Sequence, residues 1–266
     1  MINDDPIFSR PATNNPYRYA LGEFYRRIKW DLNINSFISR RKLIRLKNSH
    51  KGEKAVILAN GPSLRDVDLN ELKNVYTFGL NKIYLLFDKT DFRPSSITVV
   101  NLDVMKQNYD FFNHTNIPLF IDNWGIRYIK PRENVVYIHH SSQPKFARDV
   151  SISYYMGATV TFAAMQLAFH MGFDKVAVVG LDHFFKEKGF SAQLVENKGE
   201  DLNHFDPNYF KGQVWGLPDL PNAEFAYNMA KDQFNMAGRM LVNCSSKTNL
   251  SPDIIPQMNL QKFLEL

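Results

Sequence analysis

The 266-residue sequence holds a single cysteine, Cys244, and has no uninterrupted run of 18 apolar residues. One cysteine excludes an intramolecular disulfide framework and fits a reducing compartment. The lack of a long apolar run argues against a membrane-spanning helix, and the first residues, Met1 to Pro6, show no signal-peptide pattern. We therefore expect a cytoplasmic protein.

Several motifs of known chemistry are also missing from the sequence. It contains no GxxxxGK[ST] phosphate loop, no three-glycine dinucleotide fingerprint, no GxSxG around a serine and no HExxH pair. These absences exclude a P-loop enzyme, a serine hydrolase of that type and a zinc protease of that type. With one cysteine there is no Cys-rich zinc site either. We expect no dedicated metal ion and no cofactor.

Acidic residues are scarce in one part of the chain. Eleven of the 32 Lys and Arg residues, but only three of the 27 Asp and Glu residues, lie between Tyr17 and Lys54. The net charge of +5 is therefore concentrated there, and the rest of the chain is slightly acidic. This distribution is not that of a uniformly basic nucleic-acid binder, so we expect no nucleic-acid partner.

The same basic segment carries apolar residues at spacings that predict helices over 19–30 and 36–48. Basic amphipathic helices are typical of binding to an anionic membrane surface or an acidic partner. Two interpretations stay open: residues 17–54 attach the protein peripherally to the inner membrane face, or both helices pack on the domain with solvated charges.

What is present favours one large α/β domain, with 44% hydrophobic residues over a chain of this length. Short apolar strands alternate with helices, which predicts a doubly wound, mostly parallel, Rossmann-like sheet. We expect an N-terminal arm over 1–50 and a nucleotide-binding domain over 51–266, with an aperiodic lid at 184–220. The predicted strands are 55–59, 75–79, 97–100, 117–121, 134–138, 175–179 and 239–243, and the predicted helices are 64–72, 103–112, 160–171 and 223–237.

The first predicted strand runs directly into Asn60-Gly61-Pro62-Ser63. Gly61 permits a positive φ or the close approach of a ligand, and Pro62 fixes its own φ. Ser63 is expected to cap the helix that follows. A strand, a glycine turn and a helix start form the arrangement in which nucleotides bind free backbone N–H groups. An ordinary turn between strand and helix is the alternative.

Polar residues follow several other predicted strands. In a doubly wound sheet the ligand crevice lies beyond the carboxyl ends of the strands, so we expect these residues to line one crevice. Asn side chains suit sugar hydroxyls and phosphate oxygens because they both donate and accept hydrogen bonds. The helix start at Gly157-Ala158-Thr159 adds free N–H groups for an anion. The residues at the strand ends are Asn60, Asn81 and Lys82, Asn101 and Asp103, and Asp182 and His183.

The predicted lid holds His204, within Asn203-His204-Phe205-Asp206-Pro207. A loop histidine near neutral pH can act as a general base, with Asp206 or another acid orienting it. The alternative is a structural histidine bonded to backbone. Trp215 is either a stacking platform for a ligand or an anchor for the lid.

Together these motifs resemble the MptE-like (6-hydroxymethylpterin diphosphokinase-like) family. The resemblance rests on Asn60-Gly61-Pro62-Ser63-Leu64, the segment Phe78 to Tyr84, and Val179-Gly180-Leu181-Asp182-His183. His204-Phe205-Asp206-Pro207 and Trp215 resemble the branch of that family found in bacterial surface-polysaccharide loci. The resemblance covers about residues 42–258.

The same motifs are also similar to those of bacterial sialyltransferases that use CMP-sialic acid. That resemblance implies donor contacts for Asn60, Asn81 and Asn101, with Asp182 and 157–159 also lining the donor site and His204 as the base. The chain departs from those enzymes at His183-Phe184-Phe185, where they carry tyrosines for the donor phosphate.

The expected function is therefore that of a sialyltransferase-like glycosyltransferase, moving an acidic sugar from a CMP donor onto a surface-glycan acceptor. The catalytic residues would be His204 and Asp182. One alternative is an ATP-dependent 6-hydroxymethylpterin diphosphokinase, with Mg²⁺ held by Asp103 and Asp182. The other is a non-catalytic nucleotide-binding scaffold. The oligomeric state does not follow from the sequence.

Overall fold

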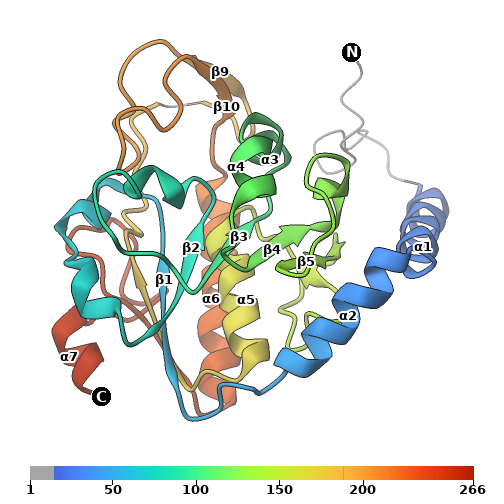
Figure 1. The fold of residues 1–266 in the computed structure, drawn as a ribbon, viewed down its shortest axis with the longest axis horizontal. Coiled ribbons are helices and arrows are strands. Elements are labelled where there is room, and N and C mark those ends of the chain that lie inside the picture. Colours follow the sequence, from blue (N-terminus) through green and yellow to red (C-terminus); the bar gives the residue numbers. More distant parts are fainter. Residues whose placement is uncertain (1–14, 188) are drawn as a thin grey trace.

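The computed structural model describes residues 15–187 and 189–266, and its centre is a seven-stranded sheet (Figure 1). The strand order is β11-β8-β1-β2-β3-β4-β5, and every neighbouring pair is parallel. Helices cover both faces, which confirms the doubly wound α/β fold. The strands are β1 (Lys54–Leu58), β2 (Tyr76–Leu80), β3 (Ser96–Val99), β4 (Leu119–Asp122), β5 (Val135–Ile138), β8 (Lys175–Val179) and β11 (Met240–Asn243).

Strand β1 lies inside the sheet and feeds both halves of the core. Because side chains alternate along a strand, Ala55 and Ile57 face one side while Val56 and Leu58 face the other. All four are fully buried, and this continuous apolar run is what a strand covered on both faces requires. Burying a side chain of this kind contributes about 1.5–3 kcal/mol.

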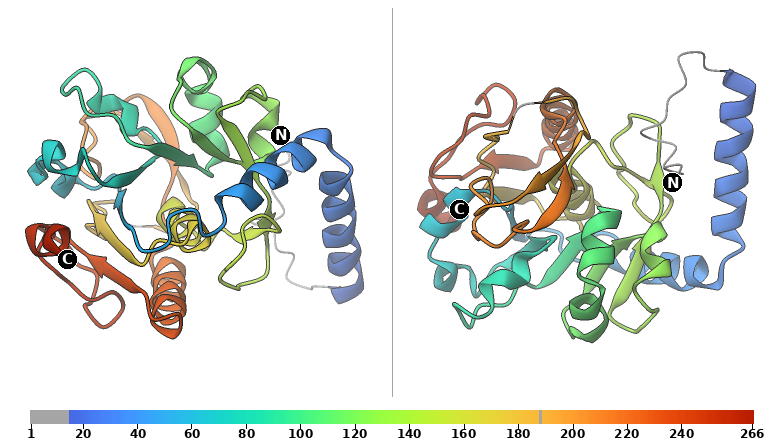
Figure 2. Two further views of the ribbon diagram at one scale, coloured as in Figure 1. Left: turned by 60° about the horizontal axis from the view of Figure 1, so that its bottom comes forward. Right: turned by 90° about the horizontal axis from the view of Figure 1, so that it is seen from above.

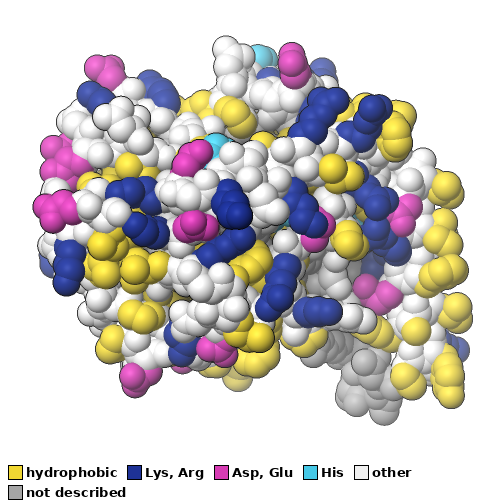
Figure 3. Space-filling model, turned by 90° about the horizontal axis from the view of Figure 1, so that it is seen from below, with side chains coloured by type: hydrophobic (Ala, Val, Ile, Leu, Met, Phe, Trp, Pro, Cys, Tyr) yellow, Lys and Arg dark blue, Asp and Glu magenta, His cyan; other side chains and the backbone are white. Residues whose placement is uncertain are grey.

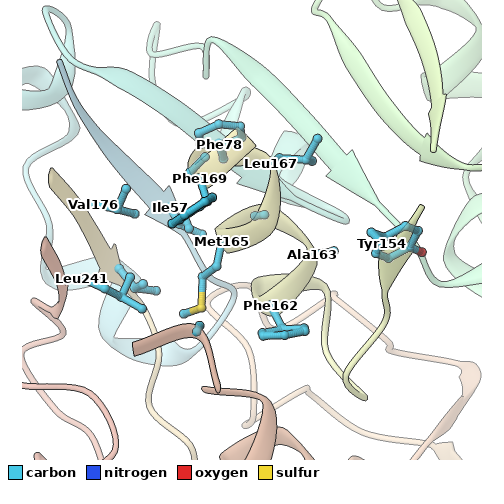
Figure 4. Packing of buried hydrophobic residues seen from close by; sticks show 14 of the residues in the cluster. Ile57, Phe78, Tyr154, Phe162, Ala163, Met165, Leu167, Phe169, Val176 and Leu241 are labelled. Atoms are coloured by element: carbon cyan, nitrogen blue, oxygen red, sulfur yellow. The ribbon is translucent and has the colours of Figure 1, made fainter. Parts of the chain in front are cut away.

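On the Ile57 side the sheet is covered by two long helices, α5 (Val160–Met171) and α6 (Leu220–Met236). Figure 4 shows Phe162, Met165 and Phe169 of α5 packed among strand residues such as Ile57. Gly172 ends α5 in the left-handed conformation with φ 95°, which a glycine adopts without strain. The predicted boundaries of α5 and of β8 match the structure.

The other side is covered by short helices: α3 (Leu102–Gln107), α4 (Tyr109–His114), α7 (Leu260–Glu265) and four single 3₁₀ turns, η1 (Pro62–Asp66), η2 (Leu69–Leu72), η3 (Ile83–Leu86) and η4 (Asn123–Arg127). The predicted helix over 64–72 is wrong, since the chain breaks into two turns, η1 and η2, around Val67. The predicted helix 103–112 is likewise split in two, at Asn108.

Two N-terminal helices lie at one end of the sheet, α1 (Pro16–Asp31) and α2 (Ile34–Leu46). Asn15 and Asn33 cap them through their side-chain oxygens. Helix α2 packs beside β5, whereas α1 stands apart from the sheet in every view of the ribbon (Figure 2). Residues 1–14 of the N-terminal arm expected over 1–50 lie outside the described residues. No helix of the described chain is long and apolar enough to cross a membrane.

The predicted lid is not wholly irregular. It contains an antiparallel hairpin of β9 (Leu194–Asn197) and β10 (Gln213–Gly216), which stands above the sheet in Figure 1. A further small parallel pair joins β6 (His140–Ser141) to β7 (Tyr154–Tyr155).

Candidate active site

The strand order reverses at β1: strands β2 to β5 follow one another on one side of it, and β8 and β11 lie on the other. The carboxyl ends of β1 and β8 therefore flank the switch point where doubly wound folds bind ligands. Asn60 follows β1 and Asp182 follows β8, so both lie at this point. The topology therefore places Asn60 and Asp182 at one edge of the sheet, as the sequence predicted.

Two hydrogen bonds join Ser63 to Asp182 at the switch point, and we call this pair the clamp. The backbone N–H of Ser63 donates to Asp182 Oδ2 at 2.8 Å, and its hydroxyl donates to Oδ1. Burial raises the pKa of Asp182, although these two hydrogen bonds act in the opposite direction. Ser63 was expected to cap a helix, but that helix is a single 3₁₀ turn without a side-chain cap, and the serine holds the carboxylate instead.

Gly61 has a different role from the two predicted for it. Its φ is −68°, so no left-handed turn is present. A Cβ at this position would lie 2.6 Å from Asp182 Cγ and 2.6 Å from the carbonyl oxygen of Gly180. The glycine therefore permits the close approach of the protein's own Asp182. Pro62 begins the 3₁₀ turn at its first position, where a missing N–H costs nothing.

Two amide side chains at this edge are incompletely bonded. The Oδ1 atoms of Asn60 and Asn81 are buried and have no hydrogen-bond partner within the described residues. A buried acceptor left unpaired costs about 1–3 kcal/mol. Asn60 and Asn81 follow the neighbouring parallel strands β1 and β2, so both lie at one edge. A ligand with hydroxyl or amino donors would satisfy both oxygens.

Other predicted residues lie further along the edge. Asn101 caps α3 by accepting from the backbone N–H of Val104 at 3.0 Å, and both Asn101 and Asp103 are exposed. They follow β3, which is separated from β1 by β2. The structure thus brings the polar residues to one edge but does not gather them into one cluster.

The helix start at 157–159 lies at the same edge, because α5 leads back to the amino end of β8. Gly157 and Ala158 have φ values of 57° and 60°, and Thr159 caps α5 through its hydroxyl. A Cβ on Gly157 would lie 2.5 Å from Phe162, so close packing requires the glycine. His183 bonds to Glu224 of α6, with 2.8 Å between Nε2 and Oε1.

The lid docks directly on the loop after β1. The backbone N–H of Phe205 donates to the carbonyl oxygen of Asn60 at 2.9 Å, and Arg65 donates to the carbonyl oxygen of His204. These bonds bring His204 beside the loop that carries Asn60, although the two are 144 positions apart.

His204 is held by a buried carboxylate. Its Nδ1 lies 2.9 Å from Asp201 Oδ2, and its ring stacks on Tyr209 with centroids 4.0 Å apart. Burial acts to raise the pKa of Asp201, but the hydrogen bond and charge of His204, together with the backbone N–H groups of Asn203 and Phe210, hold that pKa below its ordinary value. The ionised carboxylate accepts the Nδ1 proton, which leaves Nε2 to take another. This geometry suits a general base.

The sequence left open whether Asp206 or another acid orients His204, and the acid that contacts it is Asp201. Asp206 accepts from Lys89 Nζ at 2.5 Å and from the backbone of Asn208, and has no bond to His204. Asp201, three residues before His204, has the orienting place. Its spacing in Asp201-Leu-Asn-His204 was a readable signal, since residues three apart readily meet in a turn.

Lys82 was expected to line the crevice, and Trp215 to be either a stacking platform or an anchor for the lid; the structure buries both. Lys82 is 1% exposed and donates to the carbonyl oxygen of Tyr209 at 2.7 Å and to Gln213 Oε1 at 2.6 Å. Burial lowers the pKa of Lys82 to about 8. Trp215 stacks on Phe210 with centroids 5.3 Å apart. Lys82 therefore fastens the lid to the domain, whereas the stack of Trp215 on Phe210 lies within the lid itself.

A second histidine, His140, is also buried against a carboxylate. His140 Nδ1 lies 3.0 Å from Asp122 Oδ2, and the Tyr154 hydroxyl donates to the same oxygen at 2.7 Å. Asp122 ends β4 and His140 follows β5, so this group lies at the carboxyl edge as well. The signal was an acid and two histidines after neighbouring predicted strands.

A shared Mg²⁺ between Asp103 and Asp182 does not fit this arrangement. Their strands, β3 and β8, are three strand spacings apart, which is about 14 Å at the edge of a sheet. Mg²⁺ binds its ligands at about 2.1 Å, so one ion cannot reach both. Both oxygens of Asp182 already accept from Ser63. No group of three or more His, Cys, Asp or Glu side chains in the described chain is arranged to hold a metal ion.

Comparison with solved structures finds similarity to the MAf glycosyltransferase from Magnetospirillum magneticum AMB-1, with 17% sequence identity and a TM-score of 0.49. The match covers 90% of this chain and 42% of that one, so this chain spans well under half of that protein. The comparison with curated proteins found no match. The sequence does match the family described as 6-hydroxymethylpterin diphosphokinase MptE-like, over residues 30–188. That range includes the clamp between Ser63 and Asp182 and covers more than half of the sequence, and the chain therefore belongs to the MptE-like family.

Proposed function

We propose that this protein is a glycosyltransferase that moves a sugar from a nucleotide donor onto a hydroxyl of a glycan acceptor, with His204 as general base. The observation that carries the proposal is the His204–Asp201 pair, which is bonded through Phe205 to the Asn60 loop at the switch point. A base fixed beside a nucleotide crevice is what activation of an acceptor hydroxyl requires.

The donor site is proposed at Asn60 and Asn81. Their unpaired amide oxygens are suited to the amino group of a base or to ribose hydroxyls. The donor phosphate would lie at the start of α5, where Gly157 and Ala158 precede the positive end of a 12-residue helix; the N–H of Thr159 itself donates to the carbonyl oxygen of Met156. The sialyltransferase-like motifs favour a CMP-activated acidic sugar as the donor.

The reaction would be a single displacement. The acceptor oxygen forms a bond to the anomeric carbon while the bond from that carbon to the donor phosphate oxygen breaks. His204 Nε2 takes the hydroxyl proton, and Asp201 balances the charge on the ring. The phosphate leaves on the nucleotide, stabilised by N–H groups at the α5 start. The lid residues Tyr209 and Trp215, both buried, exclude water that would otherwise hydrolyse the donor.

The membership of the MptE-like family favours a second candidate, pyrophosphoryl transfer from ATP to 6-hydroxymethylpterin. That chemistry needs charge neutralisation on the transferred phosphates, usually by Mg²⁺. Since Asp103 and Asp182 do not fit one shared ion, we derive no step through a metal and place this candidate second.

One screen separates the candidates. Melting temperature and product formation are measured with CMP, CMP-sugars, other nucleoside diphosphate sugars and ATP, each with and without Mg²⁺, and with a pterin acceptor for ATP. We expect stabilisation by a CMP-sugar and release of CMP that persists in EDTA. Strict Mg²⁺ dependence with ATP converted to AMP would establish the diphosphokinase. Nucleotide binding without turnover of any donor would point to a scaffold.

A further inference from the structure

Helix α1 carries an apolar stripe that faces away from the protein. Its positions repeat at the three- and four-residue spacings of one helix face. The side chains are 40% to 83% exposed, whereas such stripes normally face a core. The stripe consists of Tyr17, Leu21, Phe24, Tyr25, Ile28 and Leu32, the last directly after the helix.

The helix is held to the domain by other residues. Trp30, which alone is buried among the residues of α1, stacks on His139 with ring centroids 5.8 Å apart. Arg27 donates to the carbonyl oxygen of Ile152 at 2.6 Å. His139 follows β5 directly, so these contacts attach α1 near the carboxyl edge of the sheet and leave the stripe uncovered.

Helix α2 likewise has one face packed on the domain and one exposed face with apolar residues. Its inner face is made of Ser36, Ser39 and Leu43, and the Ser39 hydroxyl accepts from the backbone N–H of Tyr137 on β5 at 3.0 Å. Its outer face exposes apolar residues interleaved with arginines: Ile34, Phe37, Ile38, Arg41, Ile44 and Arg45.

The charge around these stripes is positive. Helix α2 has no acidic residue, and the two acids of α1 are already paired, Glu23 with Arg26, and Asp31 with Arg27 and Arg40. Within the described residues, Arg18, Lys29, Arg41 and Arg45 make no ion pair. Figure 3 shows hydrophobic side chains gathered at the right-hand edge of the molecule, where α1 lies, with Lys and Arg side chains beside them.

We propose that the outer faces of α1 and α2 bind the surface of an anionic lipid bilayer. The apolar stripe would enter the boundary between headgroups and acyl chains, and the basic side chains would contact lipid phosphates. A bilayer offers an apolar and an anionic layer together, which this face requires. A second copy fits less well, because a two-fold interface sets the same basic surface against itself.

The test uses the full-length chain and co-sedimentation with vesicles. Vesicles of phosphatidylcholine alone are compared with vesicles that also contain phosphatidylglycerol, at salt concentrations that shorten the screening length from about 10 Å to about 3 Å. We expect binding that needs the anionic lipid and fades as salt rises. Equal binding to both vesicles, or no binding, would overturn the proposal.

Two variants identify the face. Leu21→Ser/Phe24→Ser/Ile28→Ser removes the stripe and is expected to weaken binding at least about tenfold. Its control is Phe225→Ser on α6, which removes an apolar side chain that is 53% exposed elsewhere and should bind as wild type.

The second variant, Arg41→Glu/Arg45→Glu, should lose about fivefold or more in vesicle affinity per charge, since each basic residue near the surface adds about 1 kcal/mol. Lys106→Glu/Lys130→Glu, with both lysines exposed, is the control.

Melting temperature and analytical ultracentrifugation accompany each variant. The changed side chains are exposed, so folding should be unaffected. A wild-type dimer that the stripe variant converts to a monomer would show that the face joins two copies, which contradicts the proposal.

Discussion

The lid and the N-terminal helices are both rich in aromatic residues, yet they use them in opposite ways. In the lid, Phe205, Tyr209, Phe210 and Trp215 are 1% to 7% exposed. On α1, Tyr17, Phe24 and Tyr25 are 64% to 79% exposed. The lid aromatics surround Lys82 and stack on His204, and so hold these polar groups in place. Apart from the buried Trp30, which stacks on His139, the aromatics of α1 make no aromatic or cation–π pair in the described chain. Aromatic content alone therefore does not distinguish a site scaffold from a docking face; burial does.

The largest effect is expected at the histidine that the lid holds. His204→Ala should lower turnover by about 10²–10⁴-fold, because a general base contributes that much, and donor affinity should stay within a few-fold. The control is His114→Ala on α4, a histidine whose side chain is 77% exposed. If the His204 variant lost melting temperature and donor affinity together, with turnover per folded molecule unchanged, the histidine would be structural.

The next effect separates the two acids of the lid. Asp201→Asn keeps the shape but removes the acceptor that fixes the Nδ1 proton of His204, so turnover should fall by about 10²-fold or more. Asp206→Asn should leave turnover close to wild type, because Asp206 contacts Lys89 instead. Steady-state rates of both variants, beside circular dichroism spectra, measure this. Equal losses would mean that neither acid orients the base specifically.

Buried and exposed aromatics should differ sharply in stability. Phe210→Ala removes a side chain packed against Trp215 and Lys82, and should reduce the free energy of unfolding by about 3–5 kcal/mol. Phe24→Ala, at a site 64% exposed, should change it by no more than about 0.5 kcal/mol. Chemical denaturation of both variants gives the two values. A large loss from Phe24→Ala would show that α1 is packed in solution.

A pH dependence is expected from the buried lysine. Burial lowers the pKa of Lys82 from its model-compound value of 10.5 to about 8, so between these values the unfolded chain binds more protons than the folded one. Stability therefore rises with pH in this window, by up to about 3 kcal/mol from this residue. Wild type and Lys82→Met are denatured at pH values across the window. As pH rises, the free energy of unfolding of wild type should increase relative to that of Lys82→Met. A difference in the free energy of unfolding that does not change with pH would mean that Lys82 keeps its ordinary pKa.

The parts of the fold that local pattern determines were predictable. Helix α5 was predicted to the residue, because a mostly apolar segment opens after Thr159 and ends at Gly172. Strand β8 was also predicted to the residue, since Lys175 to Val179 is apolar after its first residue and is bounded by turns. In both cases the hydrophobic run and its stop signals lie next to each other in the sequence.

The errors lie where a distant residue decides the outcome. Ser63 reads as a helix cap, but its partner is Asp182, 119 positions later. Lys82 follows a strand and was expected to line the crevice, but the lid residues Tyr209 and Gln213 bind it and bury it. Sequence periodicity carries no information about such partners. The edge on which Asn60, Asn81 and Asp182 meet was predictable, because parallel strands share their carboxyl ends.

The central claim is that a nucleotide binds at the switch point, on the amides of Asn60 and Asn81 and within reach of His204. A crystal structure of the full chain soaked or grown with CMP tests it most directly. We predict that hydroxyl or amino donors of the nucleotide lie within hydrogen-bonding distance of both Oδ1 atoms, with the phosphate at the start of α5. A nucleotide bound at another edge, with Asn60 and Asn81 still unpaired, would contradict the account.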